Sequence, residues 1–167
     1  PSRHGLIGNI WFDRTTDEMT YNIEDARYPL LTAGADVDKS TEIDPTQRTA
    51  RSDGRSPASI LVSTFGDELS IHTAQKAKVF GVSIKDRGAV AMAGHAGKAF
   101  WFSKAKGEFV TSSFYYDKYP EWVENFNATK PAHKYANKSW ELMYEPLQYL
   151  FGDKDDQEWE TSFGKYG

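Results

Sequence analysis

The sequence contains no cysteine. This absence excludes disulfides, thiolate zinc sites and cysteine nucleophiles. It leaves the compartment open, because a periplasmic protein can lack cysteine as readily as a cytosolic one. No apolar run is long enough to cross a bilayer, so we expect no membrane insertion. No signal-peptide pattern is present, although a chain that begins at Pro1 is equally compatible with a leader that has been removed.

Clusters of basic residues are also missing. The chain has 20 Lys and Arg against 24 Asp and Glu, a formal net charge of -4, and no run rich in Lys and Arg. Proteins bind nucleic acid through extended basic surfaces that neutralise phosphates. The composition therefore argues against nucleic acid as a partner, and any recognition of anions has to be local.

The length of 167 residues predicts a single domain, 1–167, with room for one hydrophobic core. The segment 32–55 is polar and rich in Gly, Asp and Thr, and connections of this length are uncommon in compact domains. We expect this segment to be a flexible loop or a lid. Aromatic residues make up 14% of the chain, which fits carbohydrate stacking or an aromatic core, and their core-like spacing favours the core.

The first half of the chain shows strand and helix patterns in alternation. Residues 10–23 predict two strands joined by a tight turn. The dipeptide Ser56-Pro57 is typical of a helix start, and apolar residues follow it at helical spacing, so we expect a helix over 57–72. Residues 79–84, VFGVSI, are largely apolar and rich in β-branched types, as in a central parallel strand covered on both faces. A short Ala-rich helix follows, with Gly94 as its C-cap.

The second half begins with the clearest hairpin of the sequence, two strands joined by a turn at 104–107. A helix is expected from Pro120 onward. An aromatic tail that includes Trp140 and Phe163 completes the sequence without a clear pattern. The succession of helix, buried strand and helix defines the fold class as α/β.

The stretch GVSIKDRG carries the most informative charges. Lys85 and Arg87 come directly after the apolar strand, at the end where ligands bind in α/β sheets. If the backbone stays extended, both cations project to the same side and Asp86 turns away. The following helix would bring backbone N–H groups and the positive end of its dipole to the same place.

A phosphate group suits two cations that converge in this way. Arginine offers a planar fork of donors and lysine a compact charge, and a monoester dianion has charge enough to occupy both. A diester carries one negative charge and needs less. A solvated turn with ordinary surface ion pairs explains the same residues, and from this tripeptide alone that explanation is ahead.

Two motifs in a fixed order change that balance. The segment HGLIGN, which ends at Asn9, resembles the HGIxxN turn of the alkaline phosphatase superfamily. The resemblance is to the branch shared by type I phosphodiesterases, nucleotide pyrophosphatases and alkaline phosphatases with a single threonine nucleophile. The pair Lys85-x-Arg87 resembles the Lys-x-Arg pair of the monoesterases in that branch. The resemblance covers the chain from Pro1 to about Asn127.

The resemblance implies both a fold and a function. The chain would be the central fragment of a zinc-dependent alkaline phosphatase that hydrolyses phosphate monoesters. Its fold would be part of an alkaline-phosphatase-like parallel-sheet sandwich with an appended antiparallel hairpin. Asn9, Lys85 and Arg87 would bind the phosphoryl group of a small phosphate ester or of inorganic phosphate. A periplasmic or secreted location is implied as well.

The resemblance also implies parts that this sequence lacks. In the complete enzyme, two zinc ions held by Asp and His residues act together with a threonine nucleophile. The nucleophile is expected upstream of Pro1, and the four histidines show no spacing typical of a zinc site. We therefore name no catalytic residue and no metal ligand within the chain. The fragment alone is expected to bind no zinc, to be inactive, and to self-associate if its open surfaces need cover.

Two other functions stay open at this point. The first is a fragment of a phosphodiesterase or nucleotide pyrophosphatase, against which the Lys-x-Arg pair argues, because an esterified oxygen would leave one cation unpaired. The second is a non-catalytic, aromatic-rich module that binds a glycan or a partner protein. Nothing in the sequence excludes the second.

Overall fold

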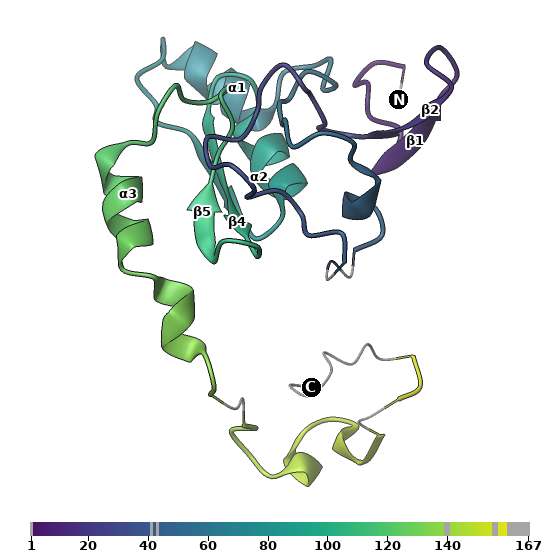
Figure 1. Cartoon of the computed structure of the whole chain (residues 1–167), viewed down its shortest axis with the longest axis vertical. Helices are drawn as coiled ribbons and strands as arrows, with labels where there is room; N and C mark the ends of the chain where they lie inside the picture. Colours follow the sequence, from purple (N-terminus) through teal and green to yellow (C-terminus); the bar gives the residue numbers. More distant parts are fainter. Residues whose placement is uncertain (1, 41, 43, 139–140, 155–156, 160–167) are drawn as a thin grey trace. The chain divides into compact units, whose positions relative to one another are not determined.

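The structure is a computed structural model that describes residues 2–40, 42, 44–138, 141–154 and 157–159. The chain forms two compact units, Pro1–His133 and Lys134–Gly167, which are described separately (Figure 1). Two residues of the expected aromatic tail, Trp140 and Phe163, lie outside the described residues.

The larger unit begins with the expected strand pair. Strands β1 (Ile10–Asp13) and β2 (Glu18–Tyr21) form an antiparallel hairpin in which Ile10 pairs with Tyr21. The Asn22 amide donates to the Asn9 carbonyl oxygen at 3.0 Å and extends the ladder by one step. Tyr21 is fully buried, so the hairpin anchors its last residue in the core.

A β-α-β unit and a second hairpin form the centre of the fold. Strands β3 (Phe80–Ser83) and β4 (Lys98–Ser103) are parallel and are connected by helix α2 (Asp86–Ala93), and β5 (Glu108–Val110) pairs antiparallel with β4. In Figure 1, α2 lies between these strands and the β1–β2 hairpin. The expected α/β class, with a parallel pair and an appended antiparallel strand, is confirmed.

Small residues allow α2 to pack closely on the sheet. Ala89, Val90 and Ala93 are fully buried against it. A Cβ atom at Gly81 of β3 would lie 2.2 Å from the Ala89 carbonyl oxygen, so only glycine fits this approach. Gly94 ends the helix at φ 63°, as its predicted C-cap role requires. The core around α2 is formed by Tyr21, Ile23, Leu30, Ala35, Ala50, Ala89, Val90, Ala93, Ala99, Trp101, Val110 and Tyr115.

The predicted start of the first helix is wrong. Helix α1 spans Phe65–His72, and its N-cap is Thr64 rather than Ser56. The Thr64 hydroxyl accepts from the Asp67 amide at 3.2 Å while the Asp67 carboxylate accepts from the Thr64 amide at 2.8 Å, which is a complete capping box. Ser56 is buried instead, and its hydroxyl donates to Asp25 at 2.6 Å. Its side chain is therefore engaged before any helix begins.

The expected cover of β3 on both faces is also wrong for this chain. Gly81 faces α2, but Phe80 is 48% exposed and Val82 is 60% exposed. Strand β3 pairs only with β4 in the described sheet, which leaves it at an edge. Helix α3 (Glu121–Ala128) begins after Pro120 as expected, and the side-chain amide of Asn127 bonds to both backbone groups of Phe109 on β5.

The described part of segment 32–55 packs against the core. It contains one short 3-10 helix, η1 (Gln47–Thr49). Gln47 and Arg55 are both buried, and the Ser103 hydroxyl donates to the Ala35 carbonyl oxygen at 2.7 Å. A role as a lid stays a prediction, but the contacts show where such a lid would rest.

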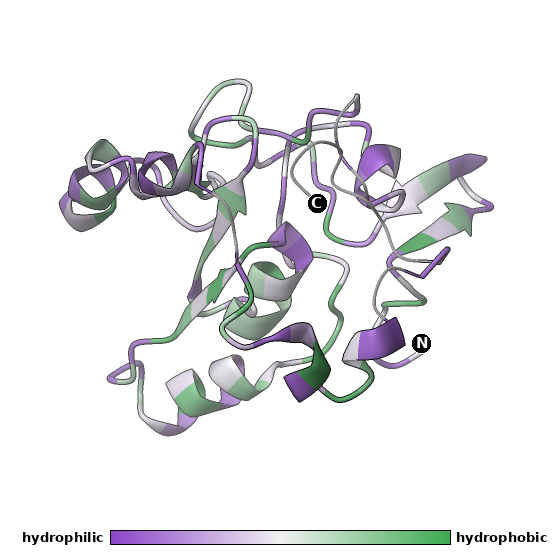
Figure 2. Cartoon of the chain, turned by 90° about the horizontal axis from the view of Figure 1, so that it is seen from below, coloured by the Kyte–Doolittle hydropathy of each residue, from purple (hydrophilic) through white to green (hydrophobic). Residues whose placement is uncertain are grey.

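Short helices account for the remaining regular structure. They are the 3-10 helices η2 (Pro131–Tyr135), η3 (Pro146–Gln148) and η4 (Gly152–Lys154). Hydrophobic and hydrophilic residues mix along the elements of the chain (Figure 2). Among the described residues, no helix has the length and apolar character needed to cross a bilayer.

Candidate functional site

Lys85 and Arg87 converge on one oxygen atom. They lie just beyond the carboxyl end of β3, where Lys85 is the N-cap of α2 and Arg87 is in its first turn. Lys85 Nζ forms an ion pair with Asp44 Oδ2, and the Arg87 guanidinium reaches the same oxygen at 2.9 Å. The expectation of an extended backbone is wrong, because Asp86 and Arg87 are helical. The N-cap geometry brings the two cations together in its place.

Asp44 and Thr46 complete this cluster. The Thr46 amide and hydroxyl donate to Asp44 Oδ1 at 2.9 and 2.6 Å, and the Arg87 guanidinium donates to the Thr46 hydroxyl at 2.8 Å. Burial raises the pKa of Asp44, but the hydrogen bonds from Lys85, Thr46 and Arg87 outweigh burial and hold this pKa well below its usual range. Asp44 is therefore an anion at neutral pH, and the cluster is an anion site that holds a carboxylate from its own chain.

Asp86 turns away from the two cations, as predicted, and enters a buried network. Its Oδ1 accepts from the Tyr21 hydroxyl at 2.7 Å, the Gln47 amide at 2.9 Å and the Arg87 backbone N–H at 2.7 Å. Burial, followed by the Asp86 charge, raises the pKa of Tyr21 well above its usual value, so Tyr21 stays a neutral donor. The network fixes the first turn of α2 and with it the backbone position of Arg87.

Arg55 is the cation of this buried network. Its side chain is only 1% exposed, and its Nε donates to Asp86 Oδ2 at 2.7 Å. A second guanidinium nitrogen contacts Asp36 at 2.8 Å. Burial lowers the pKa of Arg55, but the charges of Asp86 and Asp36 outweigh burial and keep the guanidinium protonated. Because Arg55 is enclosed and fully paired, it supports the site from behind and does not reach a ligand.

Asn9 lies on the exposed turn that leads into β1. Among the described residues, no hydrogen bond or ion pair joins its side chain to Lys85 or Arg87. Its backbone lies one ladder step from Tyr21, whose hydroxyl bonds to the residue between the two cations. The β1–β2 hairpin therefore links the backbone of Asn9 to the site through Tyr21 and its hydrogen bond to Asp86. Direct contact of the Asn9 side chain with phosphate stays a prediction.

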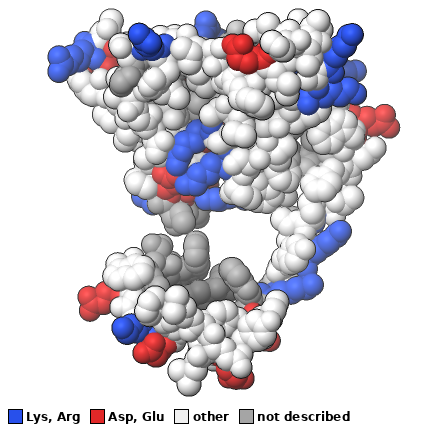
Figure 3. Space-filling view, turned by 180° about the vertical axis from the view of Figure 1, so that it is seen from behind, with Lys and Arg blue, Asp and Glu red and all other residues white. Residues whose placement is uncertain are grey.

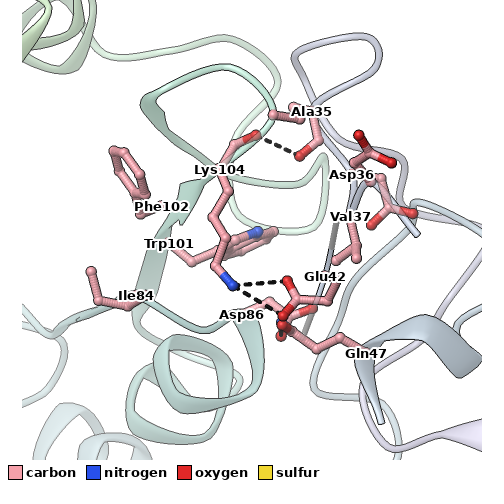
Figure 4. A pocket seen from close by; sticks show the side chains of 13 residues that line it. Ala35, Asp36, Val37, Glu42, Gln47, Ile84, Asp86, Trp101, Phe102 and Lys104 are labelled. Carbon is pink, nitrogen blue, oxygen red and sulfur yellow. Dashed lines mark hydrogen bonds and ion pairs between the residues drawn. The ribbon is translucent and has the colours of Figure 1, made fainter. Parts of the chain in front are cut away.

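A small cavity lies beside Asp86 and is distinct from the cation pair. Its volume is about 40 Å³, and the residues around it include Glu42, Gln47, Asp86 and Lys104. Figure 4 shows the Lys104 amine directed at the Glu42 carboxylate, and the distance between these groups is 3.0 Å. Pockets for small-molecule ligands are roughly 300–1,000 Å³. This cavity is too small for a phosphate ester, so a substrate would approach Lys85 and Arg87 from solvent.

The described residues do not fit a metal ion. Within the described ranges, no group of three or more His, Asp or Glu side chains is arranged to bind one. The His95 ring contacts the Asp67 carboxylate at 3.0 Å, and the His95 backbone N–H donates to the same carboxylate at 2.8 Å. Both contacts fasten the loop after α2 to α1. On the face seen in Figure 3, the basic side chains of the larger unit gather in separate small groups and form no continuous basic surface. Local recognition of anions, as expected from the composition, stays a prediction.

Sequence reasoning missed Asp44 and Arg55, because both lie in segment 32–55, far along the chain from Lys85 and Arg87. A charged residue in a polar segment carries no local signal of its partner. Arg55 had one usable hint, since it stands next to Ser56-Pro57 where the chain becomes apolar again. Asp44 had none.

Comparison with known proteins now gives this geometry a context. No family model matches the chain. It is 34% identical over 164 residues to alkaline phosphatase PhoV of Synechococcus elongatus, covering 98% of this chain and 27% of PhoV. It is 34% identical over 167 residues to alkaline phosphatase PafA of Elizabethkingia meningoseptica, covering 98% and 28%. A third relative, named calcium-transporting ATPase, from Myroides odoratus, is 30% identical over 164 residues, covering 98% and 27%.

Solved structures agree with these relatives. The crystal structure of wild-type PafA superposes with a TM-score of 0.71 at 32% identity, over 89% of this chain and 26% of PafA. A PafA variant superposes with a TM-score of 0.72 at 28% identity. In that variant a threonine is changed to serine, and an asparagine, a lysine and an arginine are changed to alanine, the lysine and arginine lying two positions apart.

These matches confirm the resemblance that the two motifs indicated. The fold is that of a segment of an alkaline phosphatase, and the chain spans about a quarter of the length of the relatives it matches. Both the sequence similarity and the structural similarity extend over nearly the whole chain.

Proposed function

We propose that this chain is the central, phosphate-binding portion of a zinc-dependent alkaline phosphatase that hydrolyses phosphate monoesters. In this proposal Lys85, Arg87 and Asn9 hold the non-bridging oxygens of the phosphoryl group. The ligand is a small phosphate ester or inorganic phosphate. The fragment alone is inactive, because the nucleophile lies outside this sequence.

The observation that carries the proposal is the convergence of Lys85 and Arg87 on a single anionic oxygen. Two cations two positions apart, one at the N-cap and one in the first turn, meet Asp44 Oδ2 at the start of α2, where the helix dipole also favours negative charge. A phosphoryl group with one oxygen at the Asp44 Oδ2 position would contact both cations at once. A charge-assisted contact of this kind is among the strongest that side chains make with phosphate.

The similar PafA variant supports the assignment of the same three residues. The lysine and arginine changed in it have the spacing of Lys85 and Arg87, and the changed asparagine precedes them as Asn9 does here. The asparagine stands closer to the lysine in PafA than Asn9 does to Lys85. This chain therefore has a longer connection between the two motifs, and segment 32–55, which carries Asp44, is part of it.

The role of the two cations follows from charge. Negative charge on the phosphoryl oxygens during transfer is stabilised by donors that are fixed in place beforehand. Arg87 is fixed because its backbone N–H is bonded to buried Asp86, and Lys85 is fixed as the residue that caps the same helix. Side chains outside the described residues would hold the two zinc ions. Bound there, the ions would supply Lewis-acid chemistry, and the binding role of Lys85 and Arg87 does not depend on them.

The proposed location is the periplasm or the exterior of the cell, in line with the relatives named alkaline phosphatase. The relative named as an ATPase makes ATP a sensible additional substrate to test, because its terminal phosphoryl group is also doubly charged. A preference for diesters is not favoured, since a single negative charge leaves one of the two converging cations without a matching charge.

Turnover by a longer natural version of this chain tests the proposal. We expect Lys85→Ala and Arg87→Ala to lower turnover of an aryl phosphate monoester by about 10²–10³-fold, the effect of removing one donor to transition-state charge. Turnover of the matching aryl diester and of ATP is measured in parallel, and the diester should lose roughly tenfold or less.

Lys104→Ala is the matched control, because it removes a lysine at the same end of the sheet that pairs with Glu42 and not with the cation site. It should leave both rates near wild type. Equal losses on monoester and diester in the Lys85 and Arg87 variants, or a comparable loss in the control, would contradict the assignment.

A further inference from the structure

The structure shows the cation pair with an occupant already in place. Lys85 and Arg87 both contact Asp44 Oδ2, and the second guanidinium nitrogen of Arg87 donates to Thr46. Asp44 and Thr46 belong to segment 32–55 and lie about 40 residues before the cations they meet. A ligand that uses both cations must therefore replace this carboxylate.

We propose that Asp44 is an intramolecular competitor for the phosphate site, and that phosphate binds only when Asp44 leaves Lys85 and Arg87. This inference rests on the proposed function, because it takes the cation pair to be the phosphate site. It makes the stretch around Asp44 a cover over the cation pair, and the contacts of Asp44 and Thr46 hold this stretch on the two cations.

The two cations are more exposed than Asp44, whose side chain is only 9% exposed, so exchange requires the stretch around Asp44 to move. The Lys85 side chain is 43% exposed and that of Arg87 is 20% exposed, so solvent and ligand reach both cations. The Arg55–Asp86 pair next to it is only 1% and 3% exposed and has no such access. When Asp44 moves away, its carboxylate re-enters water and the incoming phosphate replaces it on the cations. The two cations thus have an anionic partner both before and after the exchange.

Competition of this kind leaves a distinctive thermodynamic signature. The apparent affinity of any ligand falls by the fraction of molecules in which the site is open, and this factor does not depend on the ligand. A carboxylate that stayed near the bound ligand and only repelled it would act differently, because a dianion would be weakened more than a monoanion. The two mechanisms are therefore separable with ligands of different charge.

The test measures binding of methyl phosphate and dimethyl phosphate to the 167-residue protein by isothermal titration calorimetry. At about pH 8 the first is a dianion and the second a monoanion. We expect Asp44→Asn to tighten both by the same factor, about tenfold. Asp38→Asn is the matched control, because it removes a carboxylate of the same segment that accepts from the Ser40 amide and hydroxyl, and it should change neither affinity.

A second measurement on the wild-type protein guards against loss of fold in the variant. The Thr46 amide donates to Asp44, so its NMR signal should shift as methyl phosphate is added, with the same midpoint as the calorimetric curve. A Thr46 signal that stays in place while phosphate binds would overturn the proposal, as it would mean that Asp44 does not leave.

The remaining outcomes are also decisive. Weaker binding in Asp44→Asn would show that Asp44 positions the cations, and a larger gain for methyl phosphate than for dimethyl phosphate would show repulsion without exchange, so either overturns competition. If Lys85→Ala and Arg87→Ala abolish binding while Asp44→Asn leaves it unchanged, the proposed phosphate site is supported and the proposed competition by Asp44 is overturned. If these two variants bind methyl phosphate as wild type does, the proposed function itself fails, and this inference fails with it.

Discussion

Asp86 and Arg87 are neighbours at the start of α2, yet each forms an arginine–aspartate pair of a different kind. Asp86 pairs with Arg55 inside the protein, where both side chains are almost completely enclosed. Arg87 pairs with Asp44 in a partly open place, where the side chain of Arg87 is 20% exposed, that of the neighbouring Lys85 is 43% exposed and that of Asp44 is 9% exposed. The same two residue types thus give an enclosed support in one place and, as we propose, an exchangeable anion site in the other. Burial decides which.

The comparison explains why the site can be both rigid and accessible. The buried pair and its partners, Tyr21 and Gln47, hold the first turn of α2 from behind. Lys85 and Arg87 are not part of this support, so in our proposal a ligand replaces their carboxylate without loss of the fold. The predictions below alter one pair at a time.

The largest effect is expected from the buried pair. Asp86→Ala leaves the Arg55 charge buried with Asp36 as its remaining partner, and it removes the acceptor of Tyr21 and Gln47. Loss of one partner of a buried ion pair costs about 3–5 kcal/mol. Urea unfolding of the protein should show a loss of this size.

Asp36→Ala is the control for that variant, because it removes the other partner of Arg55, which is 25% exposed. Its loss should be about 1 kcal/mol, close to that of a partly exposed pair. A cost below about 1 kcal/mol for Asp86→Ala would mean that the buried pair does not hold the fold.

A smaller and pH-dependent effect is expected from the contact of Asp44 with Lys85 and Arg87. The folded-state pKa of Asp44 is depressed below its ordinary value of 3.8, so its contribution to the free energy of unfolding is present above that value and is lost as pH falls through the folded-state pKa. Asp44→Asn should therefore cost about 1 kcal/mol at neutral pH. The difference from wild type should narrow progressively as the pH falls below the ordinary value of 3.8.

Unfolding curves of wild type and Asp44→Asn, recorded side by side from neutral pH down to about pH 2, measure this difference directly. A difference that grows as the pH falls would have the opposite sign to the one that a depressed pKa requires. It would show that the Asp44 carboxylate is not stabilised by Lys85 and Arg87.

The smallest effect is expected from Lys104, which is 51% exposed and pairs with Glu42 beside the small cavity. The Glu42 side chain is 5% exposed, but it also accepts from the Asp44 amide, and a pair whose cation stays in water contributes about 0.2–1 kcal/mol. Lys104→Ala should lower the free energy of unfolding by about 0.5 kcal/mol and leave phosphate binding unchanged. A loss as large as that of Asp86→Ala, in the same unfolding assay, would remove burial as the feature that separates the two kinds of pair.

Local patterns predicted most elements of the larger unit. The two hairpins, the parallel strand and helix α2 follow from alternation, turn residues and Gly94, which all act within a few residues. The start of α1 was missed because Ser56-Pro57 and Thr64 with Asp67 are both good N-terminal signals, and only the burial of Ser56 decides between them. The exposure of β3 was missed because an apolar strand does not reveal which of its faces this chain covers.

The site was predicted in part for the same physical reason. Lys85 and Arg87 were found because they are two residues apart and follow a strand. Asp44 and Arg55 were not, because their partners lie 41 and 31 residues away along the chain. Ion pairs of this range depend on the path of segment 32–55, which carries little hydrophobic pattern. The part of Asn9 in binding phosphate stays a prediction.

The most direct test of the central claim is an NMR titration of the wild-type protein with inorganic phosphate, observing the Lys85 side-chain methylene next to Nζ and the Arg87 Nε–H together. The account predicts that both signals shift with a single common midpoint, because one phosphate replaces one carboxylate on both groups. Signals that shift with different midpoints, or that do not shift while phosphate binds elsewhere, would contradict it.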